Sequence, residues 1–125
     1  MRLRSWPSFF LLSFLLLSCG KEVPMLNGVD LDKWKSDKDA CGGYRQSIAA
    51  SLTLEISKLK GLSEMDIIGL LGKPDQNELY KRNQKFYSYF LAPGPSCAAP
   101  DSASHKLILR FNAMGYAQQV SIGDD

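Results

Sequence analysis

The stretch 59–75 constrains this chain more than any other, because it predicts two helices that meet at a tight corner. Ser63 is a residue type that caps helix N-termini, and Asp66 stands three residues later, where the acid of a capping box occurs. Gly72 suits the left-handed position that follows a helix, and Pro74 prevents the helix from continuing. The stretch therefore predicts a short helix with a defined beginning and end.

A helical period leads into this corner. Between residues 46 and 59, Ile48, Leu52 and Leu59 fall on one stripe, as in a helix that buries one face. The second helix, over 63–71, is apolar nearly all round. This pattern predicts that the second helix is buried between the first helix and a sheet.

Four segments after the corner show the alternation that is typical of strands. The clearest is 85–91, with a short partner at 78–81, and two further strands are predicted at 106–112 and 116–122. Gly115 suits the hairpin turn between the last two. Two helices followed by three or four antiparallel strands predict an α+β fold of two layers, with the helices packed on one face of the sheet.

The N-terminus has the features of an export signal. Arg2 and Arg4 precede an apolar run at 9–17, which is shorter than the roughly 20 residues of a membrane-spanning helix. The sequence Leu-Leu-Ser-Cys that ends at Cys19 resembles the bacterial lipobox. This resemblance implies cleavage before Cys19 and acylation of that cysteine, whereas the alternative is an ordinary secretory leader with an incidental cysteine.

The expected organisation is a signal peptide at 1–18, the lipidated Cys19 with a tether at 19–29, and a single domain at 30–125. Several acyl chains would hold the protein on a bilayer, since each buried CH₂ contributes about 0.8 kcal/mol. In a Gram-negative bacterium, aspartate directly after the lipidated cysteine commonly retains lipoproteins in the inner membrane. Under this resemblance, Gly20 at that position implies the outer membrane and its periplasmic face.

The charge balance excludes one class of partner. The chain has 15 basic and 13 acidic residues, and the leader takes away two arginines and no acid, which leaves 13 of each sign. No long basic run remains in the mature chain. Nucleic-acid binding therefore has no electrostatic support.

Two cysteines remain after Cys19 is assigned to lipid. A disulfide between Cys41 and Cys97 is the simplest pairing in an exported, oxidising compartment. The alternatives are a reactive thiol or a metal site, but His105 is the only histidine available as a further ligand. Cys97 lies in the Pro-rich segment 92–104, which is either a binding loop or a strand connection that the disulfide pins.

Three catalytic or ligand-binding motifs fail on inspection. A calcium loop starting at Asp37 would have Ile48 where the bidentate acid belongs, so a solvated turn is expected there. A phosphate loop ending near Lys73 lacks its first glycine and its final Ser or Thr. Cys97 and His105 have no signature of a nucleophilic dyad around them. We expect no enzyme activity, no catalytic residues, no metal and no cofactor.

The capped stretch 59–75, the aromatic strand 86–90 and the hairpin over 107–115 occur in an order that resembles small outer-membrane lipoproteins of the SmpA/OmlA (BamE) type. The helix–helix–sheet unit is also similar to the repeat of β-lactamase-inhibitory protein. The resemblance implies a role as an accessory subunit of outer-membrane assembly, as another envelope lipoprotein or as an enzyme inhibitor. The Gln-Gly-Asn segment that the assembly subunit has before its first helix is missing, so none of its binding residues is transferred.

The expected function is a non-enzymatic, outer-membrane-anchored lipoprotein that serves as a small protein-binding or scaffold module in the cell envelope. An inhibitor that caps an enzyme is the alternative. Its partner would be an unidentified envelope protein, with no small-molecule substrate implied. The expected contact surface combines Tyr87, Tyr89, Pro95 and Ser102, because aromatic residues beside a polar loop suit recognition. Alternatively, the two tyrosines form a core with Trp34, which is expected to anchor the preceding segment.

Overall fold

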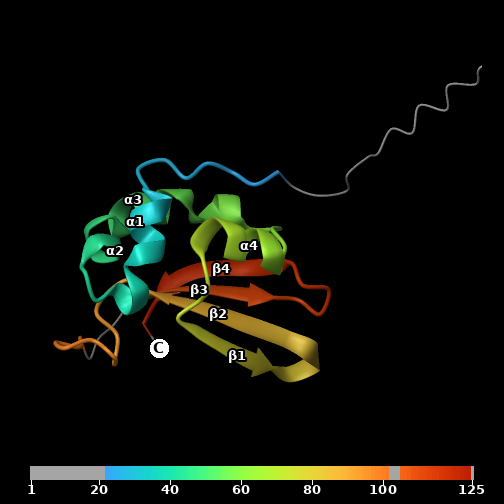
Figure 1. Cartoon of the computed structure of the whole chain (residues 1–125). Coiled ribbons are helices and arrows are strands. Elements are labelled where there is room, and N and C mark those ends of the chain that lie inside the picture. Colours follow the sequence, from blue (N-terminus) through green and yellow to red (C-terminus); the bar gives the residue numbers. More distant parts are fainter. Residues whose placement is uncertain (1–21, 102–104, 125) are drawn as a thin grey trace, which may run out of the picture.

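The computed structural model describes residues 22–101 and 105–124; Cys19, the leader and Ser102 lie outside these ranges. The chain forms two layers, with the helices together on one face of an antiparallel sheet (Figure 1). The predicted α+β class and the order of helices before strands are therefore confirmed.

The helical layer contains short helices and single turns. They are α1 (Leu31–Ser36), η1 (Lys38–Ala40), α2 (Tyr44–Ser47), α3 (Ala49–Glu55), η2 (Ile56–Leu59) and α4 (Glu64–Leu71). The helix expected over 46–59 is thus divided into parts of α2, α3 and η2. Helix α1 was not predicted, because its six residues bury only Trp34 and leave no period to detect.

Four strands form the other layer: β1 (Gln76–Tyr80), β2 (Gln84–Phe90), β3 (Lys106–Phe111) and β4 (Ala117–Gly123). Neighbours in sequence are neighbours in the sheet, in the order β1-β2-β3-β4, and every pair is antiparallel. The 3₁₀ turn η3 (Lys81–Asn83) joins β1 to β2. All four predicted strands are present within a few residues of their expected ends.

The helical corner forms as its capping residues predict. The Ser63 side chain accepts a hydrogen bond from the backbone N–H of Asp66 at 3.1 Å. Gly72 has a positive φ of 80° directly after α4, a conformation that a residue with a side chain rarely adopts. Backbone hydrogen bonds of 2.8 Å join Gly61 and Leu62 to Ala117, so the corner is fastened to β4.

The core lies between α1, α3, α4 and the face of the sheet that they cover. Trp34 is fully buried there, and its indole Nε1 donates to the Leu71 carbonyl at 3.0 Å, which confirms its predicted role as an anchor. Leu26 also belongs to this core. The tether expected to extend to residue 29 is therefore too long, because the folded domain includes Leu26.

Candidate functional site

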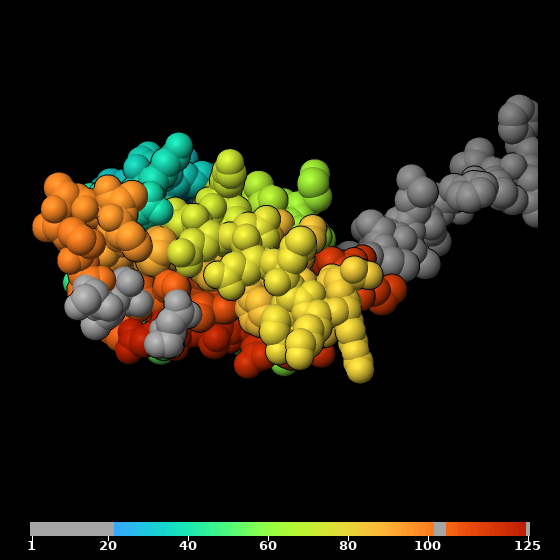
Figure 2. Space-filling model, turned by 90° about the horizontal axis from the view of Figure 1, so that it is seen from below, coloured from blue at the N-terminus to red at the C-terminus, as the bar shows by residue number. Residues whose placement is uncertain are grey.

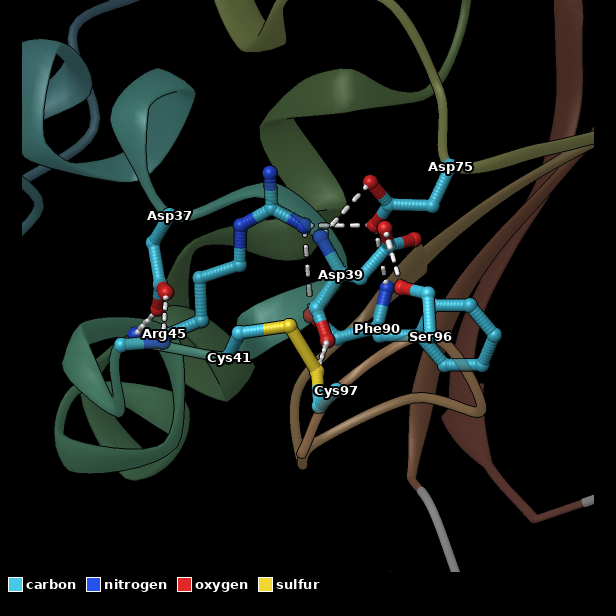
Figure 3. Close-up of a disulfide and its surroundings, with 9 residues drawn as sticks. Asp37, Asp39, Cys41, Arg45, Asp75, Phe90, Ser96 and Cys97 are labelled. Carbon is cyan, nitrogen blue, oxygen red and sulfur yellow. Dashed lines mark hydrogen bonds and ion pairs between the residues drawn. A yellow bond between two sulfur atoms is a disulfide. The ribbon is translucent and has the colours of Figure 1, made fainter. Parts of the chain in front are cut away.

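A disulfide joins Cys41 to Cys97 across a sequence separation of 56 residues, which confirms the predicted pairing. It connects the turn after η1 to the loop after β2 (Figure 3). The two irregular segments of the domain therefore meet at one end of the helical layer.

A buried arginine lies beside this disulfide (Figure 3). Arg45 is only 1% exposed, and its Nη1 donates to Asp75 Oδ2 at 2.6 Å. Its Nε donates to the Trp34 carbonyl at 3.1 Å, and the guanidinium carbon lies 4.5 Å from the centre of the Trp34 ring. Such a charge is tolerated in a core only when it is paired and hydrogen-bonded, and both conditions hold here.

Asp75 connects three parts of the fold. Besides Arg45, its Oδ2 accepts from the Phe90 backbone N–H at 2.9 Å, and its Oδ1 accepts from the Asp39 N–H at 3.1 Å. The carboxylate thus links the backbone at Asp75 to strand β2 and to the segment 38–41, here called the disulfide turn, which ends at Cys41. The sequence identified this position only as the end of a helix.

The composition of the acidic turn before Cys41 predicts a solvated turn, but the structure buries part of it. Asp37 is buried, and it accepts hydrogen bonds from the N–H groups of Gly42 at 2.5 Å and Arg45 at 2.9 Å. Asp39 has a left-handed φ of 57° and its side chain accepts from Ser96 Oγ at 2.8 Å. These two aspartates therefore organise the turn through hydrogen bonds within the protein.

The Pro-rich loop is attached to this turn by more than the disulfide. The Gly94 N–H donates to the Asp39 carbonyl at 2.9 Å, and a Cβ at Gly94 would lie 3.0 Å from the Phe90 ring. Pro95 is exposed, while Ser102 lies outside the described residues. The described part of the loop therefore fits the interpretation of a connection that the disulfide pins.

The prediction that Tyr87 and Tyr89 belong to a contact surface is wrong. Their side chains are 5% and 0% exposed, because alternation along β2 places both on the face of the sheet that the helices cover. The Tyr87 hydroxyl donates to Glu64 Oε1 at 3.0 Å, and the Tyr89 hydroxyl donates to the Gly72 carbonyl at 2.8 Å. The alternative, in which both tyrosines pack in a core with Trp34, is the one the structure has.

Burial of these two tyrosines changes their acidity. Burial, together with the hydrogen bond and negative charge of Glu64, raises the pKa of Tyr87 to about 12. Burial raises the pKa of Tyr89 still further above its usual range, with smaller contributions from Tyr87 and Asp75. Both phenols therefore stay protonated in the folded chain where an exposed tyrosine would begin to ionise.

Large apolar side chains reach the surface at several other places, which include Met25, Leu54, Met65 and Met114. On β1, Leu79 and Tyr80 are 81% and 51% exposed, and the Tyr80 ring meets the Phe86 ring edge-on at a centroid distance of 5.2 Å. Seen from below, the β1–β2 hairpin, in yellow, lies at the front of the molecule (Figure 2). Strand β1 pairs only with β2 among the described strands, so its outer edge is available.

A basic cavity of about 450 Å³ adjoins the disulfide turn and the end of α4. Its charged lining consists of Lys35, Lys38, Lys73, Arg45, Asp39 and Asp75. Four cations against two carboxylates give this lining a net charge of +2. No sequence motif had indicated the cavity, because its residues come together only in the fold.

Within 22–101 and 105–124, no group of three or more His, Cys, Asp or Glu side chains is placed to hold a metal ion. The sulfur of Cys97 is in the disulfide, and His105 Nδ1 pairs with Asp124 Oδ1 at 2.7 Å. Cys97 therefore offers His105 no thiol to activate as a nucleophile.

No helix in the described part of the chain is long and apolar enough to cross a membrane. Comparison of the chain with protein-family models, with curated proteins and with solved structures finds no match.

Proposed function

We propose that this chain is a non-enzymatic lipoprotein, anchored through Cys19 at the periplasmic face of the outer membrane, whose folded domain binds another envelope protein. The leader and the lipobox-like sequence that ends at Cys19 support the anchor. The seven residue-to-residue steps from Cys19 to Leu26 span at most about 25 Å. The domain would therefore work close to the bilayer surface, as a SmpA/OmlA-like lipoprotein would.

The observation that carries the binding role is the exposed apolar surface of the edge strand β1. Edge strands are usually protected by charge, proline or a covering segment, because their free N–H and C=O groups can pair with another chain. On β1 the exposed Glu78 is the one charged residue within the strand, and the neighbouring Leu79 and Tyr80 are also exposed. A partner strand added along β1 would gain backbone hydrogen bonds and place side chains beside Leu79 on one face of the sheet and beside Tyr80 on the other.

Photo-crosslinking in intact cells tests this surface. A photoreactive residue at Leu79 is expected to crosslink to one discrete envelope protein, whereas the same residue at the exposed Ala50 on α3 is the matched control. Replacing Tyr80 with Ser should weaken the Leu79 crosslink without changing the amount of protein. Equal crosslinking from both positions, or none from Leu79, would contradict the proposed surface.

A further inference from the structure

The basic cavity beside the disulfide is lined by Arg45, whose Nη2 has no hydrogen-bond partner among the described residues. Arg45 donates hydrogen bonds from Nε to the Trp34 carbonyl and from Nη1 to Asp75 and the Phe90 carbonyl. A guanidinium has five N–H donors, so the Nη2 hydrogens of Arg45 remain available to an acceptor in the cavity.

Lysines supply the remaining positive charge. Lys35 Nζ donates to the Gly69 carbonyl at 3.0 Å, which still leaves two of its three hydrogens for a ligand. A Cβ at Gly72 would lie 3.1 Å from Lys35 Cγ, so the glycine lets this lysine lie close along the cavity wall. Lys38 and Lys73 are exposed and can turn toward a bound anion.

The two carboxylates in the wall are already engaged. Asp75 is paired with Arg45 and accepts two backbone N–H groups, and Asp39 accepts from Ser96. These two carboxylates therefore hold the cations in position and compete little with an additional anion. The Nη2 group of Arg45 and the lysine amines remain available to an additional anion.

The donor set favours phosphate over carboxylate. Two-pronged recognition of a carboxylate uses two guanidinium nitrogens side by side, and only one nitrogen of Arg45 remains. Lysines act as separate point charges, which suits a phosphate group with its charge near −2 and three acceptor oxygens. The cavity is also larger than one phosphate group needs. We propose that it binds the phosphate group of a small phosphorylated solute.

A nuclear magnetic resonance titration tests this site, with the full chain in non-ionic micelles and sodium chloride holding the ionic strength constant. The probes are orthophosphate, glycerol 3-phosphate and succinate. We expect saturable shifts of the Arg45 Nε–H and Lys73 backbone signals with both phosphates. Succinate forms fewer charged hydrogen bonds with this donor set, so it should bind about tenfold more weakly or worse.

Variants distinguish the site from general attraction to a basic surface. Replacing both Lys38 and Lys73 with Gln removes two cations from exposed positions and should raise the dissociation constant about tenfold or more. Lys81→Gln, on η3 and outside the cavity lining, is the matched control and should leave it unchanged. Shifts that never saturate, equal binding of succinate, or equal loss in both variants would overturn the proposal. None of these results depends on the protein partner proposed above.

Discussion

Replacing Asp75 with Asn is the most informative test of how this domain is held together. The substitution keeps the shape of the side chain but removes the charge opposite Arg45, which is buried with it. The amide oxygen can retain Arg45 and the Phe90 N–H, and its NH₂ then faces the Asp39 N–H, so a donor meets a donor.

The magnitude follows from burial. Removing one partner of a buried ion pair costs about 3–5 kcal/mol, because the other charge is left in the core without compensation. A domain of this size has about 5–15 kcal/mol of stability in total, so Asp75→Asn should remove a large fraction of it. The same Asp-to-Asn change at the exposed Asp124, which pairs with His105, should cost less than about 1 kcal/mol.

Urea denaturation followed by circular dichroism measures both variants, using the chain from Gly20 onward with its disulfide intact. Every described member of the core lies in this part of the chain. The midpoint should fall strongly for Asp75→Asn at an unchanged m-value and barely move for Asp124→Asn. If both variants lose the same small amount of unfolding free energy, the buried Arg45–Asp75 pair does not stabilise the fold.

Three further predictions concern the same domain. Replacing Cys41 and Cys97 together with Ser should lower the free energy of unfolding by up to about 4 kcal/mol, by the loop-entropy relation for a separation of 56 residues; a loss below about 1 kcal/mol in the same urea assay would contradict it. Gly94→Ala should cost about 1–3 kcal/mol because its methyl group would crowd the Phe90 ring at 3.0 Å, and a thermal melt that matches the unaltered chain would refute this. The pKa of Tyr87 is about 12 in the folded chain against 10.0 unperturbed, so its contribution to stability is fully present below about pH 10 and is lost as the pH rises toward 12. Tyr87→Phe should therefore make the loss of stability against urea at alkaline pH shallower. An unchanged dependence on pH would contradict the raised pKa of Tyr87.

The elements could be predicted from sequence where their signals are local. Ser63 and Gly72 mark the two ends of α4 by residue type alone, and alternation locates the strands. Alternation does not reveal which face the helices cover. For that reason Tyr87 was expected at the surface, although it packs in the core.

The site could not be predicted in the same way. Arg45 and Asp75 are separated by 30 residues, and neither is unusual in its local sequence. Only the packing of α1, the disulfide turn and β2 brings them together. The disulfide was predictable because few cysteines remained to pair, whereas the basic cavity depends on positions that no spacing rule connects.

Metabolic labelling with palmitate tests whether Cys19 is acylated. The unaltered chain should incorporate label and fractionate with the outer membrane, while Cys19→Ser should incorporate none and leave that fraction. An unaltered chain that is unlabelled and released in soluble form would contradict both the proposed location and the proposed role.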